Sequence, residues 1–204
     1  MNTTTFECFL SDTKKELKKH GINVILSKGS NLNFKEDHTR VCGFFDEANK
    51  VLAVATNRPV WDWGSTYIHE YCHFRQWIEK NPLWTECDKY RILWRWVAGE
   101  QIDFKLVKKE IIAIRNMELD CERSTVKLII SHKFDFDIPH YIKDAAAYIY
   151  YYNYMLETEH RKWFPSKNPP YGNKRILDAM PTTLRGNFKK LPKKILGLYK
   201  EIYI

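Results

Sequence analysis

The alternation of apolar and polar positions predicts a small sheet in the first quarter of the chain. Apolar residues recur at helical spacing over residues 11–20 and stop at Gly21, which predicts a short helix. The β-branched run over residues 22–26 predicts a strand. Two further apolar runs, residues 41–45 and 51–55, flank a turn-like segment and predict a hairpin.

Helical periodicity dominates the remainder of the chain. A helix is predicted over residues 65–79, with Ser65 as its N-cap and an end before Asn81-Pro82. Three more helices are predicted over residues 86–97, 104–131 and 139–163. A small sheet followed by many helices predicts an α+β fold.

The predicted helix 65–79 contains the segment His69-Glu70-Tyr71-Cys72-His73, which has the form H-E-x-x-H. A helix turns about 100° per residue, so the two histidines share one face and both can reach one Zn²⁺ at about 2.0–2.1 Å. Glu70 lies beside that face, where a carboxylate can act as general base on a zinc-bound water. The alternative is a helix with two surface histidines.

A third ligand is needed for a catalytic zinc site, and residues 117–123 of the predicted long helix offer one. Glu118 and Glu122 are one turn apart, so we expect Glu118 to bind the metal and Glu122 to accept the N–H of a liganding histidine. Cys72 and Cys121 project about 80° away from the metal face, which favours small buried packing residues. The alternative for each is a soft metal ligand or a redox-sensitive thiol.

These motifs carry a family resemblance. His69-Glu70-x-x-His73 followed by Glu118-x-x-Cys121-Glu122 resembles the gluzincin branch of zincin metallopeptidases, although that family usually has Asp where this chain has Glu122. The resemblance implies a zincin-like fold, a bound zinc ion, Glu70 as general base and a sheet whose edge strand aligns an extended peptide. The wider sequence, including HEYCHFRQW, MELDCER and RKW, resembles uncharacterised tailed-phage proteins classed as metallopeptidases, which would act in the host cytoplasm.

Hydrolysis of an amide also requires a donor for the developing oxyanion. The resemblance implies a tyrosine or histidine from a later helix, and an arginine is a further possibility. The candidates are Tyr148, Tyr151, Tyr152, His160 and Arg123. Spacing alone does not choose among them, because tyrosines at helical spacing also fill cores.

The positive charge of the chain is concentrated near its C-terminus. The net charge is +8, and residues 160–204 contain eleven Lys and Arg but two acidic residues, which leaves a net charge of −1 in the rest. We therefore expect residues 1–131 to form a metal-binding core and residues 132–204 a helical, basic extension packed on it, so that the two make one compact domain. Such an extension can bind nucleic acid or an acidic partner, or it can be a solvated surface.

Cysteine usage and hydropathy bear on the compartment. The five cysteines are an odd number without a C-x-x-C pair, which argues against a disulfide framework and for a reducing compartment. No apolar stretch approaches the roughly 20 residues of a membrane-spanning helix, and the N-terminus lacks the pattern of a signal peptide. We therefore expect a soluble, cytoplasmic protein without a membrane partner.

Taken with the motifs, these features predict a zinc-dependent hydrolase, a metallopeptidase that acts on a peptide or protein substrate. One alternative keeps the metal but has another hydrolytic chemistry or a structural zinc ion. Another is a non-catalytic zinc-containing protein that binds nucleic acid or a host protein through the basic C-terminal region.

Overall fold

The computed structural model has the α+β composition predicted from the sequence, with a small mixed sheet and a mostly helical remainder. It describes residues 3–34, 39–87, 89, 91–165 and 168–203. The chain forms two compact units: unit 1 consists of Met1–Lys80 and Arg123–Ile138, and unit 2 of Asn81–Glu122 and Pro139–Ile204. The predicted boundary between a core and an extension at residue 131 stays a prediction.

The sheet of unit 1 has three strands in the order β1-β5-β4. Its members are β1 (Asn23–Ser27), β5 (Val51–Ala55) and β4 (Gly43–Asp46). The antiparallel β4–β5 pair confirms the predicted hairpin, and the parallel pairing of β1 with β5 was not expected. A separate two-stranded pair, β2 (Leu32–Phe34) and β3 (Thr39–Val41), was not predicted, and only Val41 of these residues lies in a predicted strand.

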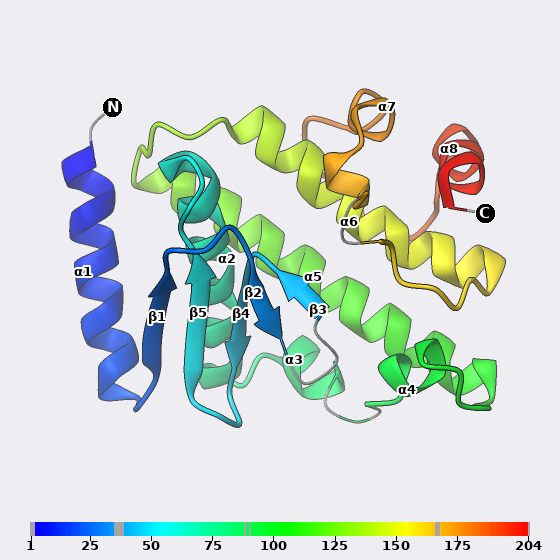
Figure 1. Cartoon of the computed structure of the whole chain (residues 1–204), viewed down its shortest axis with the longest axis horizontal. Helices are drawn as coiled ribbons and strands as arrows, with labels where there is room; N and C mark the ends of the chain where they lie inside the picture. The colour runs from blue at the N-terminus through cyan, green and yellow to red at the C-terminus, as the bar shows by residue number, and fades with distance from the viewer. Residues whose placement is uncertain (1–2, 35–38, 88, 90, 166–167, 204) are drawn as a thin grey trace. The chain divides into compact units, whose positions relative to one another are not determined.

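Two helices of unit 1 pack with this sheet. Helix α1 (Thr3–Lys19) begins well before the predicted residue 11, and helix α2 (Val60–Ile78) contacts β4 and β5 (Figure 1). The Tyr67 hydroxyl, on a fully buried side chain of α2, lies 2.8 Å from the Thr13 hydroxyl of α1. Contacts of this kind fix the helix that carries the H-E-x-x-H motif.

Helix α2 begins five residues earlier than predicted, so the prediction of Ser65 as N-cap is wrong. Pro59 is the N-cap residue, and the Ser65 hydroxyl donates to the carbonyl of Asp62, 2.7 Å away and within the helix. Arg58 donates to the Asp62 carboxylate at 2.6 Å and ties the first turn to the end of β5. A proline suits a helix start because it lacks the backbone N–H that would remain unsatisfied there.

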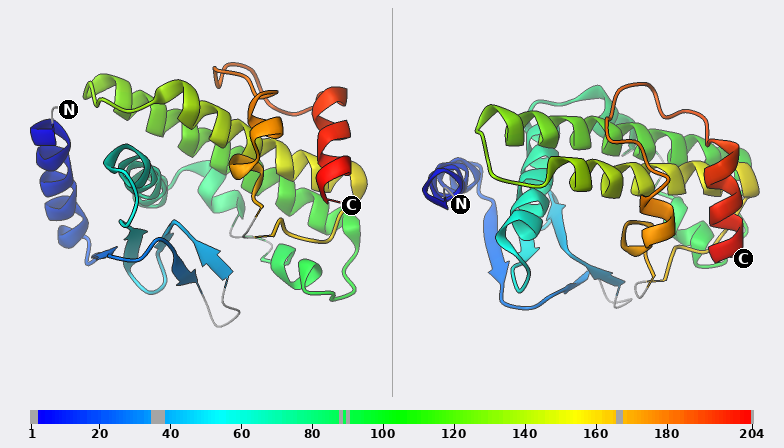
Figure 2. Two further views of the ribbon diagram at one scale, coloured as in Figure 1. Left: turned by 45° about the horizontal axis from the view of Figure 1, so that its top comes forward. Right: turned by 90° about the horizontal axis from the view of Figure 1, so that it is seen from above.

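Most of the remaining helices belong to unit 2. They are α3 (Pro82–Cys87), α4 (Leu93–Val97), α5 (Phe104–Ser131), α6 (Ile138–Thr158), the 3-10 helix η1 (Pro170–Gly172), α7 (Lys174–Leu177) and α8 (Lys193–Tyr203). Helix α5 has the predicted bounds, and it lies beside α6 (Figure 2). Its last nine residues belong to unit 1, because Arg123–Ile138 is part of that unit.

The helix predicted over residues 86–97 is two short helices, α3 and α4. The buried carboxylate of Glu110 accepts hydrogen bonds from the backbone N–H groups of Ile92 and Leu93, both at 2.7 Å. These are N–H groups at the start of α4, where a helix has no internal acceptor for them. A residue of α5 therefore determines where α4 begins. The periodicity of residues 86–97 alone does not show this break, because the acceptor lies in another helix.

The C-terminal residues form part of the core of unit 2. Tyr199 is fully buried, and its hydroxyl donates to the Ala147 carbonyl of α6 at 2.7 Å. The side chain of Asn153 donates to the carbonyl of Phe188 at 2.7 Å. Truncation of the C-terminal residues would remove these contacts and expose buried side chains of α6. Point substitutions are therefore the better test of what the basic C-terminal residues do.

No disulfide joins the five cysteines in the described part of the chain. Across the residues that the structure describes, no helix has both the length and the apolar character needed to cross a membrane.

Candidate metal centre

The two histidines of the H-E-x-x-H motif are neighbours on α2. Their ring centroids are 4.6 Å apart and the ring planes are nearly perpendicular. His73 is buried and His69 is half-buried. One face of α2 therefore presents two imidazoles to the same small volume.

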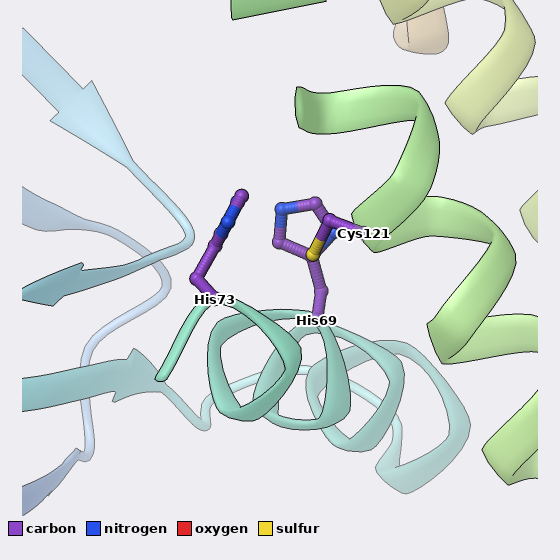
Figure 3. A group of neighbouring side chains, drawn as sticks. All are labelled: His69, His73 and Cys121. Carbon is purple, nitrogen blue, oxygen red and sulfur yellow. The ribbon is translucent and has the colours of Figure 1, made fainter. Parts of the chain in front are cut away.

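Cys121 of α5 joins the two histidines (Figure 3). The ligand atoms of His69, His73 and Cys121 all lie within 4.8 Å of one another, and Cys121 is fully buried. Ligand atoms bound tetrahedrally at 2.0–2.3 Å are separated by about 3.5 Å, so a modest contraction would bring these three around one ion. The group could hold a metal ion.

The chemistry of the donors limits which ion fits. Two imidazole nitrogens and a thiolate suit zinc and similar borderline-soft ions, whereas magnesium and calcium prefer oxygen ligands. Three protein ligands also leave a fourth tetrahedral position for water or substrate. This donor set is therefore compatible with the Zn²⁺ expected from the sequence.

Glu118, the predicted third ligand, is buried on α5 one turn before Cys121, but it is not a member of the three-residue group. It lies near two tyrosines of α6, whose hydroxyls are 2.8 Å apart. Burial raises the pKa of Tyr148 and Tyr152 well above the usual value, and the charge of Glu118 adds to the rise. The role of Glu118 as a ligand stays a prediction.

His73 has a hydrogen-bond partner that sequence reasoning missed. Its Nδ1 lies 2.9 Å from the side-chain oxygen of Gln76, which is itself buried. Since an amide oxygen accepts a hydrogen bond, the proton sits on Nδ1 and the Nε2 lone pair is left for a metal. The signal in the sequence is the i, i+3 spacing of the two residues on one helix face.

Glu122 was expected to orient a liganding histidine. Its carboxylate accepts a hydrogen bond from the hydroxyl of Tyr141, and its side chain is buried. The orienting role stays a prediction.

Glu70 is buried beside the first residues of β4. A Cβ atom on Gly43 would lie 3.2 Å from Glu70 Cγ and 2.7 Å from Thr66 Cγ2. Burial raises the pKa of the neighbouring Cys42 thiol, and the charge of Glu70 contributes to the rise. Because residue 43 is glycine, β4 approaches α2 at the position of the predicted general base, a feature that the sequence pattern did not reveal.

The other candidate oxyanion donors have different surroundings. The hydroxyl of Tyr151 donates to the carbonyl of Lys162 at 2.9 Å. The ring of His160 packs on that of Tyr154, with centroids 5.1 Å apart, and burial lowers its pKa. Arg123 is exposed. None of these contacts identifies the donor.

Comparison with protein-family models, with curated proteins and with solved structures found no match. Inference about function therefore depends on the chemistry of these side chains.

Proposed function

We propose that this chain is a zinc-dependent hydrolase that cleaves peptide bonds and has a zincin-like fold. The observation that supports the proposal is the cluster of metal-binding atoms on His69, His73 and Cys121, with the buried Glu70 on the same helix as the histidines. A histidine pair flanking a carboxylate in the order H-E-x-x-H is suited to hydrolysis by an activated water.

Four residues of α2 have distinct parts in the proposed reaction. His69 and His73 would hold the metal through imidazole nitrogens, and Gln76 keeps His73 in the required tautomer. A zinc ion held there would supply Lewis acidity, which acidifies water and polarises a carbonyl group. Glu70 accepts the proton of the attacking water and returns it to the leaving amine.

A peptide is the proposed substrate because of the strand beside the general base. β4 is an outer strand of the three-stranded sheet, and it begins at Gly43, next to Glu70. In the family that the motifs resemble, an edge strand aligns an extended substrate by backbone hydrogen bonds. A substrate aligned along β4 would have a peptide bond within reach of Glu70.

The direct test is metal analysis together with an activity assay. We expect one zinc ion per purified chain and slow cleavage of denatured casein. A chelator should abolish the cleavage and added Zn²⁺ should restore it, because zinc is the proposed Lewis acid for the water. Protein that takes up no zinc even after reconstitution would exclude the proposed function.

A second candidate function, binding of nucleic acid, is favoured by one observation in unit 2. Between Arg185 and Lys200 lies an exposed set of basic residues, which we name the C-terminal basic segment. Its members are Arg185, Lys189, Lys190, Lys193, Lys194 and Lys200. Clustered exposed cations can replace the counterions of a polyanion.

For this candidate we expect salt-sensitive retention of duplex DNA. The double variant Lys193→Glu with Lys194→Glu should lose most of it, and the fold should persist because acidic residues suit the first turn of α8. The matched control is Lys108→Glu with Lys109→Glu, an equal charge change at exposed positions of α5. Equal losses in the two variants would point to net charge alone and contradict a specific binding segment.

A further inference from the structure

We infer that the thiolate of Cys121, rather than the carboxylate of Glu118, is the third protein ligand of the metal. The inference deepens the proposed function and rests on its metal-dependent part. It changes the donor set from two nitrogens and an oxygen to two nitrogens and a sulfur.

The positions of the atoms are the first argument. The Cys121 sulfur is already within 4.8 Å of the ligand atoms of both histidines, whereas Glu118 is not in that group. A cysteine side chain reaches a metal through one rotatable bond, so its sulfur position follows directly from the backbone of α5. Little adjustment of Cys121 is needed for coordination.

The surroundings of Glu118 are the second argument. Its charge acts on two tyrosine hydroxyls of α6, Tyr148 and Tyr152, both in unit 2 with Glu118. The Glu118 carboxylate therefore lies close enough to α6 for its charge to act on these hydroxyls, while the Cys121 sulfur lies beside the two histidines.

The surroundings of the thiol are the third argument. Cys121 is fully buried, and two imidazoles lie beside its sulfur. A purely apolar packing role for the thiol would not account for the imidazoles beside it.

A cysteine ligand also affects which metal ion the site selects. A thiolate with two imidazoles favours Zn²⁺ and Co²⁺ over Mg²⁺, Ca²⁺ and Mn²⁺, because soft sulfur discriminates against hard ions. The set His69, His73 and Glu118 would discriminate less. The third ligand can therefore be identified from the absorption spectrum of the bound metal, without an activity assay.

The experiment replaces zinc by Co²⁺ in the full chain and records its absorption spectrum. A thiolate ligand gives a sulfur-to-cobalt charge-transfer band in the near ultraviolet, which oxygen and nitrogen ligands do not give. We expect the band in the wild type and its loss in Cys121→Ser, with the metal affinity lowered by more than the 10–100-fold that an outer partner contributes. Cys72→Ser, at the buried cysteine of α2, is the matched control and should keep the band.

A second variant tests the same point in case Cys121→Ser does not fold. It keeps Cys121 and replaces the four other cysteines by serine, so that Cys121 is the only thiol of the chain. The replaced residues are Cys8, Cys42, Cys72 and Cys87. We expect this variant to keep the charge-transfer band of the wild type.

The possible outcomes separate the inference from the proposed function. Cobalt that binds the wild type without a charge-transfer band, or a band that persists in Cys121→Ser, would overturn the assignment of Cys121 and leave a metal-dependent hydrolase standing. A third outcome is that Glu118→Gln loses most of its metal, while the Co²⁺ that remains bound keeps the charge-transfer band. Both Glu118 and Cys121 would then be ligands, and the inference that Cys121 takes the place of Glu118 would be overturned. Failure to bind Co²⁺ or Zn²⁺ at all would overturn both proposals.

Discussion

The variant Glu70→Gln should fold, keep its zinc and lose nearly all hydrolytic activity. Glutamine has the size and polarity of glutamate but cannot accept the proton of the attacking water as a carboxylate does. General-base assistance contributes about 10²–10⁴-fold, so cleavage of denatured casein should fall by at least that order. Glu70 lies on α2 between the two histidines in sequence and is buried, so its side chain is already constrained by packing.

The control for this variant is Glu79→Gln. Glu79 is the exposed C-cap residue of the same helix, where it pairs with Arg75. Its replacement should leave both zinc content and cleavage unchanged. If Glu70→Gln cleaved as fast as the wild type, the carboxylate would not be the base and the proposed mechanism would fail.

The variant His73→Ala should lose its zinc. Removal of one imidazole leaves two protein ligands, which make a poor zinc site. Gln76→Ala should have a graded effect, because it removes the hydrogen bond to His73 Nδ1 but no ligand. Loss of such an outer partner weakens metal affinity by about 10–100-fold. Elemental analysis and competition with a chelator measure both effects.

His20→Ala is the matched control for these two variants. His20 is exposed after the end of α1, and its ring packs on that of Phe74. Zinc content should not change in this variant. A chain with Ala at position 73 that still held a full equivalent of zinc would show that the metal binds elsewhere.

Local sequence pattern determined the elements whose residues interact mainly with their own neighbours. The bounds of α5 follow from helical periodicity over 28 residues, and the β4–β5 hairpin follows from two apolar runs around a turn. The adjacency of His69 and His73 is likewise a property of one helix, since residues four apart share a face.

Only the tertiary structure decided which residues from distant segments meet. The parallel pairing of β1 with β5, the start of α4 at the Glu110 carboxylate and the approach of Gly43 to Glu70 each join positions at least 17 residues apart. Periodicity cannot encode such contacts, because it describes one segment at a time. For the same reason the sequence placed Glu118 and Cys121 three residues apart on one helix and favoured Glu118 as the ligand, whereas Cys121 is the residue whose ligand atom lies near those of both histidines. The rotation of α5 about its own axis decides that, and packing against other elements fixes this rotation.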